Sequence, residues 1–259
     1  MLRSFALFIG CFLLGAPLLA QETDLTHKAT TPTAKPEWDW WPERHEAKKA
    51  EAAAKPVDYV FIGDSITHGW EILYGGPGYG LALSDEAQQY YKEGAGQVVF
   101  NERFADKNVL NLGFGGDETQ NLLWRLNDGA VDGLNPKAVV LMIGINNIAV
   151  SGMSADETFA GIQAVVAKLR EKLPNARIVL MAVLPIRENK PLTEQWQAQV
   201  EQLNPKLAQF AADSNITFLE LGPKLVGPDG LPRIDLMPDG VHPNAAGYRI
   251  WADLLEQVL

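Results

Sequence analysis

Short, continuous hydrophobic runs alternate along this chain with longer stretches in which hydrophobic residues recur every three or four positions. The unbroken runs are typical of parallel strands that are buried on both faces. They lie at Asp58–Ile62, Val109–Leu112, Ala138–Ile143, Ile178–Val183 and Thr217–Leu221. The helical patterns lie at about Thr119–Leu126, Ala155–Leu173, Thr193–Ala212 and Asn244–Val258. This alternation predicts an α/β fold in which right-handed crossovers place helices on both faces of a central parallel sheet.

The N-terminal part of the chain does not follow this alternation. Residues 1–20 combine one arginine, an apolar stretch and a small-residue end, which predicts a secretory signal peptide cleaved after Ala20. A transmembrane anchor and a lipoprotein attached through Cys11 are the alternatives to simple export. Residues 21–36 are rich in Thr, Ala, Lys and Pro and are expected to form a flexible leader. The folded domain is expected to span residues 37–259, in a secreted or periplasmic protein.

Two further segments need separate interpretation. In residues 37–55, three tryptophans precede a charged, alanine-rich stretch, which predicts an N-terminal helix anchored on the domain by its aromatic residues. A carbohydrate-stacking surface is the alternative role for these tryptophans. Residues 74–103 have no regular place in the sheet. An insertion of this length near a catalytic loop can form a lid or a pocket wall, or a surface excursion without function.

Composition and charge narrow the function classes. With 259 residues and 47% hydrophobic content, the chain can bury the core of one globular domain. A net charge of −10 without a basic stripe argues against nucleic acid or anionic membrane surfaces as partners. The only cysteine, Cys11, lies in the predicted signal peptide, so the mature chain has no disulfide, thiol nucleophile or thiolate metal site. Stable membrane insertion after signal cleavage is not expected.

Four polar blocks lie where strands should end or where the last helix should begin. Ligands bind beyond the carboxyl ends of the strands in sheets of this kind, so these blocks are the candidate functional site. They are GDSIT at Gly63–Thr67, NLGFGGD at Asn111–Asp117, GINN at Gly144–Asn147 and DGVHP at Asp239–Pro243.

The first block offers a nucleophile and the last a base. Ser65 follows a strand and begins a helical turn, where unpaired backbone N–H groups can stabilise an oxyanion; a plain N-cap is its structural alternative. The block is not a G-x-S-x-G elbow, so an ordinary α/β-hydrolase is disfavoured. His242 is the strongest candidate base, because Asp239 three residues earlier can hold one ring nitrogen while the other faces Ser65. The same spacing also fits an Asx turn.

The middle blocks offer hydrogen-bond donors. Paired glycines in GFGGD let backbone N–H groups approach a substrate closely, and Asn146 presents a side-chain amide at a strand end. Glu118 replaces the third glycine of a G-x-G-x-x-G motif, so dinucleotide binding is unsupported. The chain has no metal-binding histidine motif and no P-loop. No cofactor and no metal are therefore expected.

These blocks resemble those of the SGNH (GDSL-type) hydrolases, over about residues 58–259. The resemblance implies a flavodoxin-like three-layer α/β/α sandwich with a central parallel sheet. It assigns Ser65 as the nucleophile of a triad with His242 and Asp239. The oxyanion hole would comprise the N–H groups of Ser65 and Gly116 and the side chain of Asn146. We also expect four other residues near these blocks to contact substrate, namely Asp64, His68, Trp70 and Asn147.

Within this family the chain is most similar to the platelet-activating-factor acetylhydrolase catalytic subunits. The shared stretches include NLGFGGDETQNLLWRL and NPKAVVLMIGINN, in which Asn147 replaces a commoner Asp. Together with the predicted signal peptide, the resemblance implies an exported serine esterase that removes a short acyl group, expected to be acetyl, from a small-molecule or glycan ester. It also implies an ability to form a homodimer. The export signal and residues 74–103 depart from those relatives, so hydrolysis of platelet-activating factor itself is not inferred. A lysophospholipase or thioesterase with the same triad, or a non-catalytic carbohydrate- or lipid-binding protein, are the alternatives.

Overall fold

The computed structural model describes residues 28–71, 88–187 and 192–259. In these ranges, the chain folds around a single sheet of five parallel strands in the order β2-β1-β3-β4-β5. The expected signal peptide and residues 21–27 of the expected leader lie outside the described ranges. Within those ranges, no helix is both long and apolar enough to cross a membrane.

The five strands coincide closely with the five hydrophobic runs of the sequence. In β2 and β3 every residue is buried, as expected of strands covered on both faces. The order, in which the second strand lies outside the first, is that of flavodoxin-like sheets. The strands are β1 (Tyr59–Gly63), β2 (Val109–Gly113), β3 (Ala138–Met142), β4 (Arg177–Met181) and β5 (Thr217–Leu219).

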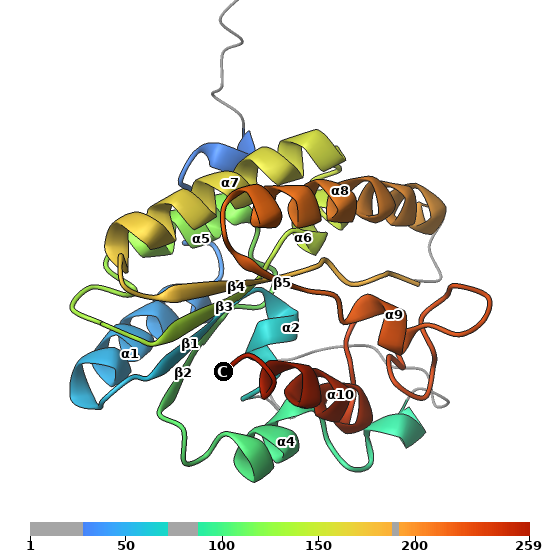
Figure 1. Cartoon of the computed structure of the whole chain (residues 1–259), viewed down its shortest axis with the longest axis horizontal. Helices are drawn as coiled ribbons and strands as arrows, with labels where there is room; N and C mark the ends of the chain where they lie inside the picture. The colour runs from blue at the N-terminus through green and yellow to red at the C-terminus, as the bar shows by residue number, and fades with distance from the viewer. Residues whose placement is uncertain (1–27, 72–87, 188–191) are drawn as a thin grey trace, which may run out of the picture.

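Helices cover both faces of the sheet, which confirms the predicted three-layer sandwich (Figure 1). One face is covered by α5 (Thr119–Asn127), α6 (Ile145–Ala149), α7 (Ala155–Lys172) and α8 (Thr193–Asp213). The other is covered by α1 (Trp40–Ala54), α2 (Ser65–His68), α4 (Gly96–Arg103) and α10 (Ala245–Leu255). The remaining helices of the described ranges are η1 (Lys28–Thr30), η2 (Gln89–Tyr91) and α9 (Gly222–Leu225).

The segment from Lys28 to Pro36 departs from the expected flexible leader, because it packs against α5 and α7. Ala29 is fully buried, and its carbonyl accepts a hydrogen bond of 2.8 Å from the Thr119 hydroxyl. The backbone of Thr33 exchanges two hydrogen bonds with the start of α5, donating to the Gln120 carbonyl and accepting from the Asn121 side chain. Burial and these hydrogen bonds compensate for the polar composition that suggested disorder.

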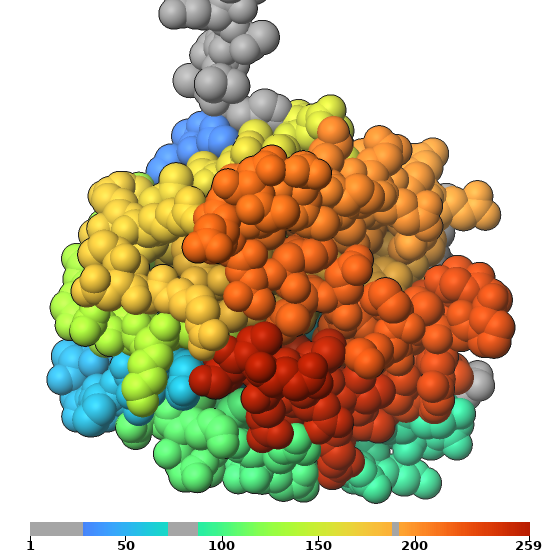
Figure 2. Space-filling view, in the orientation of Figure 1, coloured from blue at the N-terminus to red at the C-terminus, as the bar shows by residue number. Residues whose placement is uncertain are grey.

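The described part of the irregular segment, residues 88–103, lies under the C-terminal helix. Helix α4 packs against α10, and the two are adjacent at the surface (Figure 2). The Tyr91 hydroxyl donates to the His242 carbonyl at 3.0 Å, and the Gly94 carbonyl accepts from the Ala245 N–H at 3.2 Å. Residues 88–103 therefore contact both the DGVHP loop and the start of α10. Residues 74–87, the rest of the segment that can form a lid or a pocket wall, lie outside the described ranges.

Candidate active site

The sheet order brings three of the four polar blocks together. Strand β1, which leads to Ser65, lies between β2, which leads to Gly116, and β3, which leads to Asn146. The fourth block precedes α10, which is held over α2 by a 2.6 Å hydrogen bond from the Tyr248 hydroxyl to the Ile66 carbonyl. All four blocks therefore meet at the carboxyl edge of the sheet.

Ser65, His242 and Asp239 form a continuous hydrogen-bonded chain. Ser65 Oγ lies 2.8 Å from His242 Nε2, and His242 Nδ1 lies 2.7 Å from Asp239 Oδ2. An ionised carboxylate only accepts hydrogen bonds, so Nδ1 holds the ring proton and Nε2 is the acceptor that faces the serine hydroxyl. This arrangement can remove the proton from Ser65 as the oxygen attacks an ester.

The Asp239 carboxylate is fixed by backbone N–H groups of the loop that follows it. Its Oδ1 accepts the N–H groups of Val241 at 2.9 Å and His242 at 2.7 Å, so the loop folds around the carboxylate. Burial alone would raise the pKa of Asp239, but the charge of His242 and these hydrogen bonds outweigh it and hold the pKa below its usual value. The carboxylate is therefore ionised at neutral pH.

The loop after β2 holds Gly116 in a conformation that favours glycine, with φ at +72°. A buried ion pair fixes this loop: Arg125 Nε donates to Asp117 Oδ2 at 2.8 Å, and other guanidinium nitrogens reach the carbonyls of Leu112 and Gly63. Arg125 is fully buried, and its position on the apolar face of α5 is the signal by which the sequence could have revealed it.

Asn146 lies close to this loop. Its side-chain Nδ2 donates to the Asp117 carbonyl at 2.9 Å, so the amide is next to Gly116. One N–H of the amide is used in that bond, and the second is available for an oxyanion. The chain turns sharply into α6 at Gly144, where φ is +128° and a β-carbon would lie 3.0 Å from Thr158.

The four residues expected to contact substrate do not all lie at the site. Trp70 is fully buried among core aromatics, with its ring 4.6 Å from Tyr248 and 5.0 Å from Trp251 by centroid. Asn147 is fully buried against the start of α5, where its oxygen accepts the Thr119 N–H at 3.0 Å. The structure gives both a packing role, because neither side chain can reach a substrate.

Asp64 and His68 flank Ser65 but are buried. Asp64 Oδ1 caps α2 by accepting the Ile66 N–H at 3.0 Å, and burial raises the pKa of Asp64 to about 7. Burial, with Arg44 and other nearby cations, lowers the pKa of His68 to about 2, so its ring is neutral. His68 Nδ1 then accepts the Gly115 N–H at 3.3 Å and ties α2 to the Gly116 loop.

The N-terminal segment brings Lys35 and Trp41 to the site, although no motif in the sequence predicts this. The Lys35 ammonium donates a hydrogen bond to the Gly116 carbonyl. Trp41 is the buried anchor, and its Nε1 donates to Asp117 Oδ1 at 2.7 Å. The N-terminal segment is thus hydrogen-bonded to the loop that contains Gly116 and Asp117.

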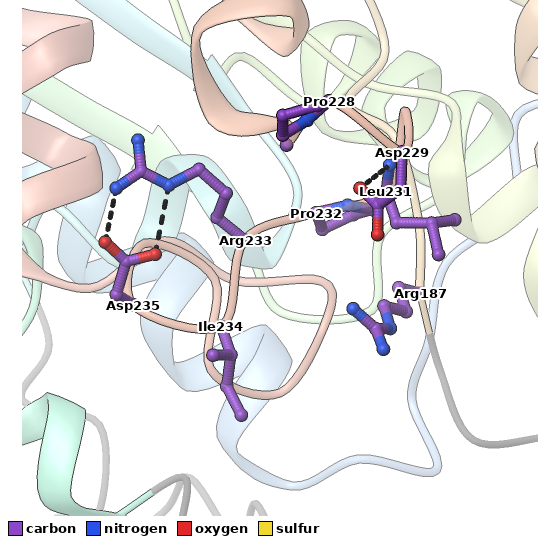
Figure 3. Close-up of a pocket in the computed structure, with 9 residues that line it drawn as sticks. Arg187, Pro228, Asp229, Leu231, Pro232, Arg233, Ile234 and Asp235 are labelled. Carbon is purple, nitrogen blue, oxygen red and sulfur yellow. Dashed lines mark hydrogen bonds and ion pairs between the residues drawn. The ribbon is translucent and has the colours of Figure 1, made fainter.

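Two other features near the site have no role in the triad. A pocket of about 430 Å³ lies beside the loop that leads to Asp239, with the ion pair of Arg233 and Asp235 on one side and Arg187 on another (Figure 3).

His45, Glu46 and Asp128 could approach one metal ion, but the Lys49 ammonium already pairs with both carboxylates. We assign no metal to that cluster.

Comparison with known proteins identifies the class of enzyme. Residues 61–250 match the model of the GDSL-like lipase/acylhydrolase family. Human platelet-activating factor acetylhydrolase IB subunit alpha1 is 31% identical over 208 residues, which are 80% of this chain and 78% of that protein. The chain belongs to the GDSL-like lipase/acylhydrolase family and is a carboxylic ester hydrolase.

Solved structures share the fold. A GDSL-like lipase from Bacteroides thetaiotaomicron superposes with a TM-score of 0.59 at 25% identity, over 82% of this chain and 95% of that one. A carbohydrate acetylesterase from Sinorhizobium meliloti superposes with a TM-score of 0.55 at 18% identity, over 79% of this chain and all of the other. These likenesses agree with the predicted sandwich.

Proposed function

We propose that this protein is an exported serine esterase that removes acetyl groups from an alcohol by a double-displacement reaction. The observation that supports it most directly is the unbroken hydrogen-bonded chain from Ser65 through His242 to Asp239. Ser65 Oγ attacks the ester carbonyl carbon while His242 Nε2 takes the serine proton. The resulting oxyanion is stabilised by the N–H groups of Ser65 and Gly116 and by the Asn146 amide.

The intermediate then collapses, and the carbon–oxygen bond to the alcohol breaks. His242 gives its proton to the leaving alkoxide, and the acetyl group remains on Ser65. Water attacks the acyl-enzyme, His242 takes a proton from that water, and acetic acid leaves as the proton returns to Ser65 Oγ. No cofactor is needed for these steps.

Three observations support a short acyl group. Ser65 is only 8% exposed, and such limited access to the nucleophile favours a small group at the carbonyl carbon. The human relative named above is an acetylhydrolase by name. A fold neighbour is a carbohydrate acetylesterase, so the fold can accommodate acetylated sugars.

The test is hydrolysis of p-nitrophenyl esters from acetate to palmitate by the protein and its Ser65→Ala variant. We expect rapid hydrolysis of acetate, a steep decline with chain length, and no turnover by the variant. An optimum at long chains would favour a lysophospholipase-like enzyme, and retained activity in Ser65→Ala would overturn the assignment of the nucleophile.

Export is a separate part of the proposal. It is supported by the charged start, apolar stretch and small-residue end of residues 1–20. Expression in a bacterial host with N-terminal sequencing of the product should give a chain that begins at Gln21 in the periplasm or medium. An uncleaved chain in the cytoplasm would contradict this part and leave the esterase assignment intact.

A further inference from the structure

Two tryptophans of the N-terminal segment remain exposed although they belong to a packed aromatic cluster. Trp38 is 39% exposed and Trp40 is 36% exposed, and the other tryptophans in the described ranges are buried or half-buried. Their ring centroids are 5.9 Å apart with 35° between the planes. Leaving such large apolar surface in water is costly, so its retention calls for an explanation.

The exposed pair lies beside the proposed oxyanion hole. A β-carbon placed on Gly116 would lie 2.5 Å from the Trp38 ring, so this ring covers the glycine directly. Trp40 stacks on His68, three residues after Ser65, with centroids 6.0 Å apart, and on Phe114 of the Gly116 loop at 6.4 Å. Both rings therefore pack against the Gly116 loop, and Trp40 also packs against the helix that begins at Ser65.

A purely structural role does not account for this exposure. Trp41 already anchors the segment, since it is 1% exposed and donates a hydrogen bond to Asp117. The family model begins at residue 61, so these tryptophans lie outside the segment that defines the family. A feature outside that segment that reaches the site is well placed to set which substrate this member accepts.

The surroundings indicate the chemistry of the occupant. Two partly exposed rings offer far less area than the roughly 800 Å² per partner that a stable protein interface needs. The Lys35 ammonium lies 4.6 Å from the Trp38 ring centroid and would repel a cationic group such as choline. A neutral ring with an apolar C–H face, such as a pyranose, fits both constraints, because it stacks on aromatic faces without a charge.

We infer that Trp38 and Trp40 form the binding surface for the alcohol part of the substrate, and that this part is a neutral sugar ring carrying acetyl esters. Because the Trp38 ring lies against Gly116, a sugar ring stacked on it would hold an acetyl group beside the proposed oxyanion hole. This inference rests on the esterase function proposed above and adds the class of alcohol to it.

The experiment compares two triacetates that differ in the alcohol. Methyl xylopyranoside triacetate presents its esters on a ring, and glycerol triacetate presents the same number on an open chain. Trp40→Ala and the double variant with Trp38→Ala should lose at least tenfold in kcat/KM on the xyloside, mainly through KM, and less than threefold on glycerol triacetate. Trp40→Phe should recover much of the loss, because it keeps a flat ring.

A control variant removes an aromatic side chain away from the site. Phe210→Ala on α8, whose ring packs against Phe159 on the other face of the sheet, should leave both substrates unaffected. Equal losses on both triacetates, or no loss on either, would overturn the inference and leave the tryptophans as supports of the Gly116 loop. Failure of Ser65→Ala to abolish glycerol triacetate hydrolysis would instead overturn the proposed function.

Discussion

The hydrogen bonds of Asp239 show how one carboxylate can fix both the tautomer and the orientation of a catalytic base. Oδ2 accepts the Nδ1 proton of His242, and Oδ1 accepts two backbone N–H groups. Asp239→Asn keeps an oxygen for the backbone but places an amide N–H against Nδ1. The imidazole would then hold its proton on Nε2 and could no longer accept one from Ser65.

We therefore expect Asp239→Asn to lower kcat by about 10³–10⁴-fold without unfolding the protein. Steady-state hydrolysis of p-nitrophenyl acetate, with circular dichroism to verify folding, measures this. A loss below tenfold in a folded variant would show that the carboxylate does not act through the tautomer of His242.

Asp64 makes stability depend on pH. Its Oδ2 is buried and has no hydrogen-bond partner, and burial raises the pKa of Asp64 to about 7 in the folded state. The folded protein therefore binds this proton more tightly than the unfolded chain, whose carboxyl has its ordinary pKa of 3.8. The contribution of Asp64 is present at low pH and is lost as the pH rises towards 7.

Asp64→Asn should remove this dependence while keeping an oxygen to cap α2. Relative to the original protein, the variant should gain about 1–3 kcal/mol of unfolding free energy between pH 5 and pH 8. Urea denaturation of both proteins at the two pH values measures the difference. A constant difference would mean that Asp64 is ionised throughout.

At this scale the sequence predicted the residues that do chemistry better than those that position them. Ser65, His242 and Asp239 belong to short motifs, and the structure brings them into one hydrogen-bonded chain. Trp70 and Asn147 do not reach the site as predicted, because nearness in sequence to Ser65 and Asn146 does not tell in which direction a side chain points. Lys35 reaches Gly116 across 81 positions, and no local pattern encodes such a contact.

Among the elements, α10 has the most direct influence on the site, because its N-cap lies two residues after His242. The Asn244 side chain accepts the Gly247 N–H at 3.1 Å and donates to the carbonyls of Asp235 at 2.8 Å and Tyr90 at 3.0 Å. One side chain thus joins the helix, the loop before Asp239 and the irregular segment. The periodic pattern predicted the helix, but not that its cap would hold these three segments together.

Asn244→Ala should therefore affect both stability and catalysis. We expect a loss of about 2–4 kcal/mol in unfolding free energy, from the cap and two buried hydrogen bonds, and a fall in kcat of at least tenfold as the His242 loop loosens. Urea denaturation and ester hydrolysis measure the two effects.

The matched control is Ser154→Ala, which removes the capping box of α7. It should cost about 1 kcal/mol and leave kcat within twofold, because its hydrogen bonds do not reach the site. Equal kcat values for the two variants would contradict the coupling of α10 to the triad.

Over the whole molecule, the sheet order and the crossovers follow from the alternation of strands and helices, but the course of the N-terminal segment does not. Residues 28–41 cross from η1, against α5 and α7, to α1 on the opposite face of the sheet. Between these two ends they pass the carboxyl edge of the sheet, where Lys35 and Trp41 donate hydrogen bonds to the Gly116 loop. The polar composition of residues 21–36 predicted a flexible leader. Composition does not record tertiary hydrogen bonds, so it could not reveal those that residues 28–36 make.

Two truncations test whether this segment is part of the folded enzyme. Removal of residues 1–27 should leave Tm and kcat nearly unchanged. Removal of residues 1–36 also deletes the hydrogen bonds of Ala29 and Thr33 to α5 and that of Lys35 to Gly116. At about 1 kcal/mol for each of four bonds, Tm should fall by roughly 8–16 °C, and kcat should fall as well.

Lys35→Met separates the two effects, because it keeps the hydrogen bonds of Ala29 and Thr33. It should reduce kcat by about tenfold while lowering Tm by only a few degrees, since Gly116 loses the donor that holds its carbonyl. Thermal unfolding and ester hydrolysis on the three proteins measure both quantities. If the chain lacking residues 1–36 matched the one lacking 1–27 in Tm and kcat, the segment would be a dispensable leader. A fall in both would make the N-terminal segment a structural part of the active site.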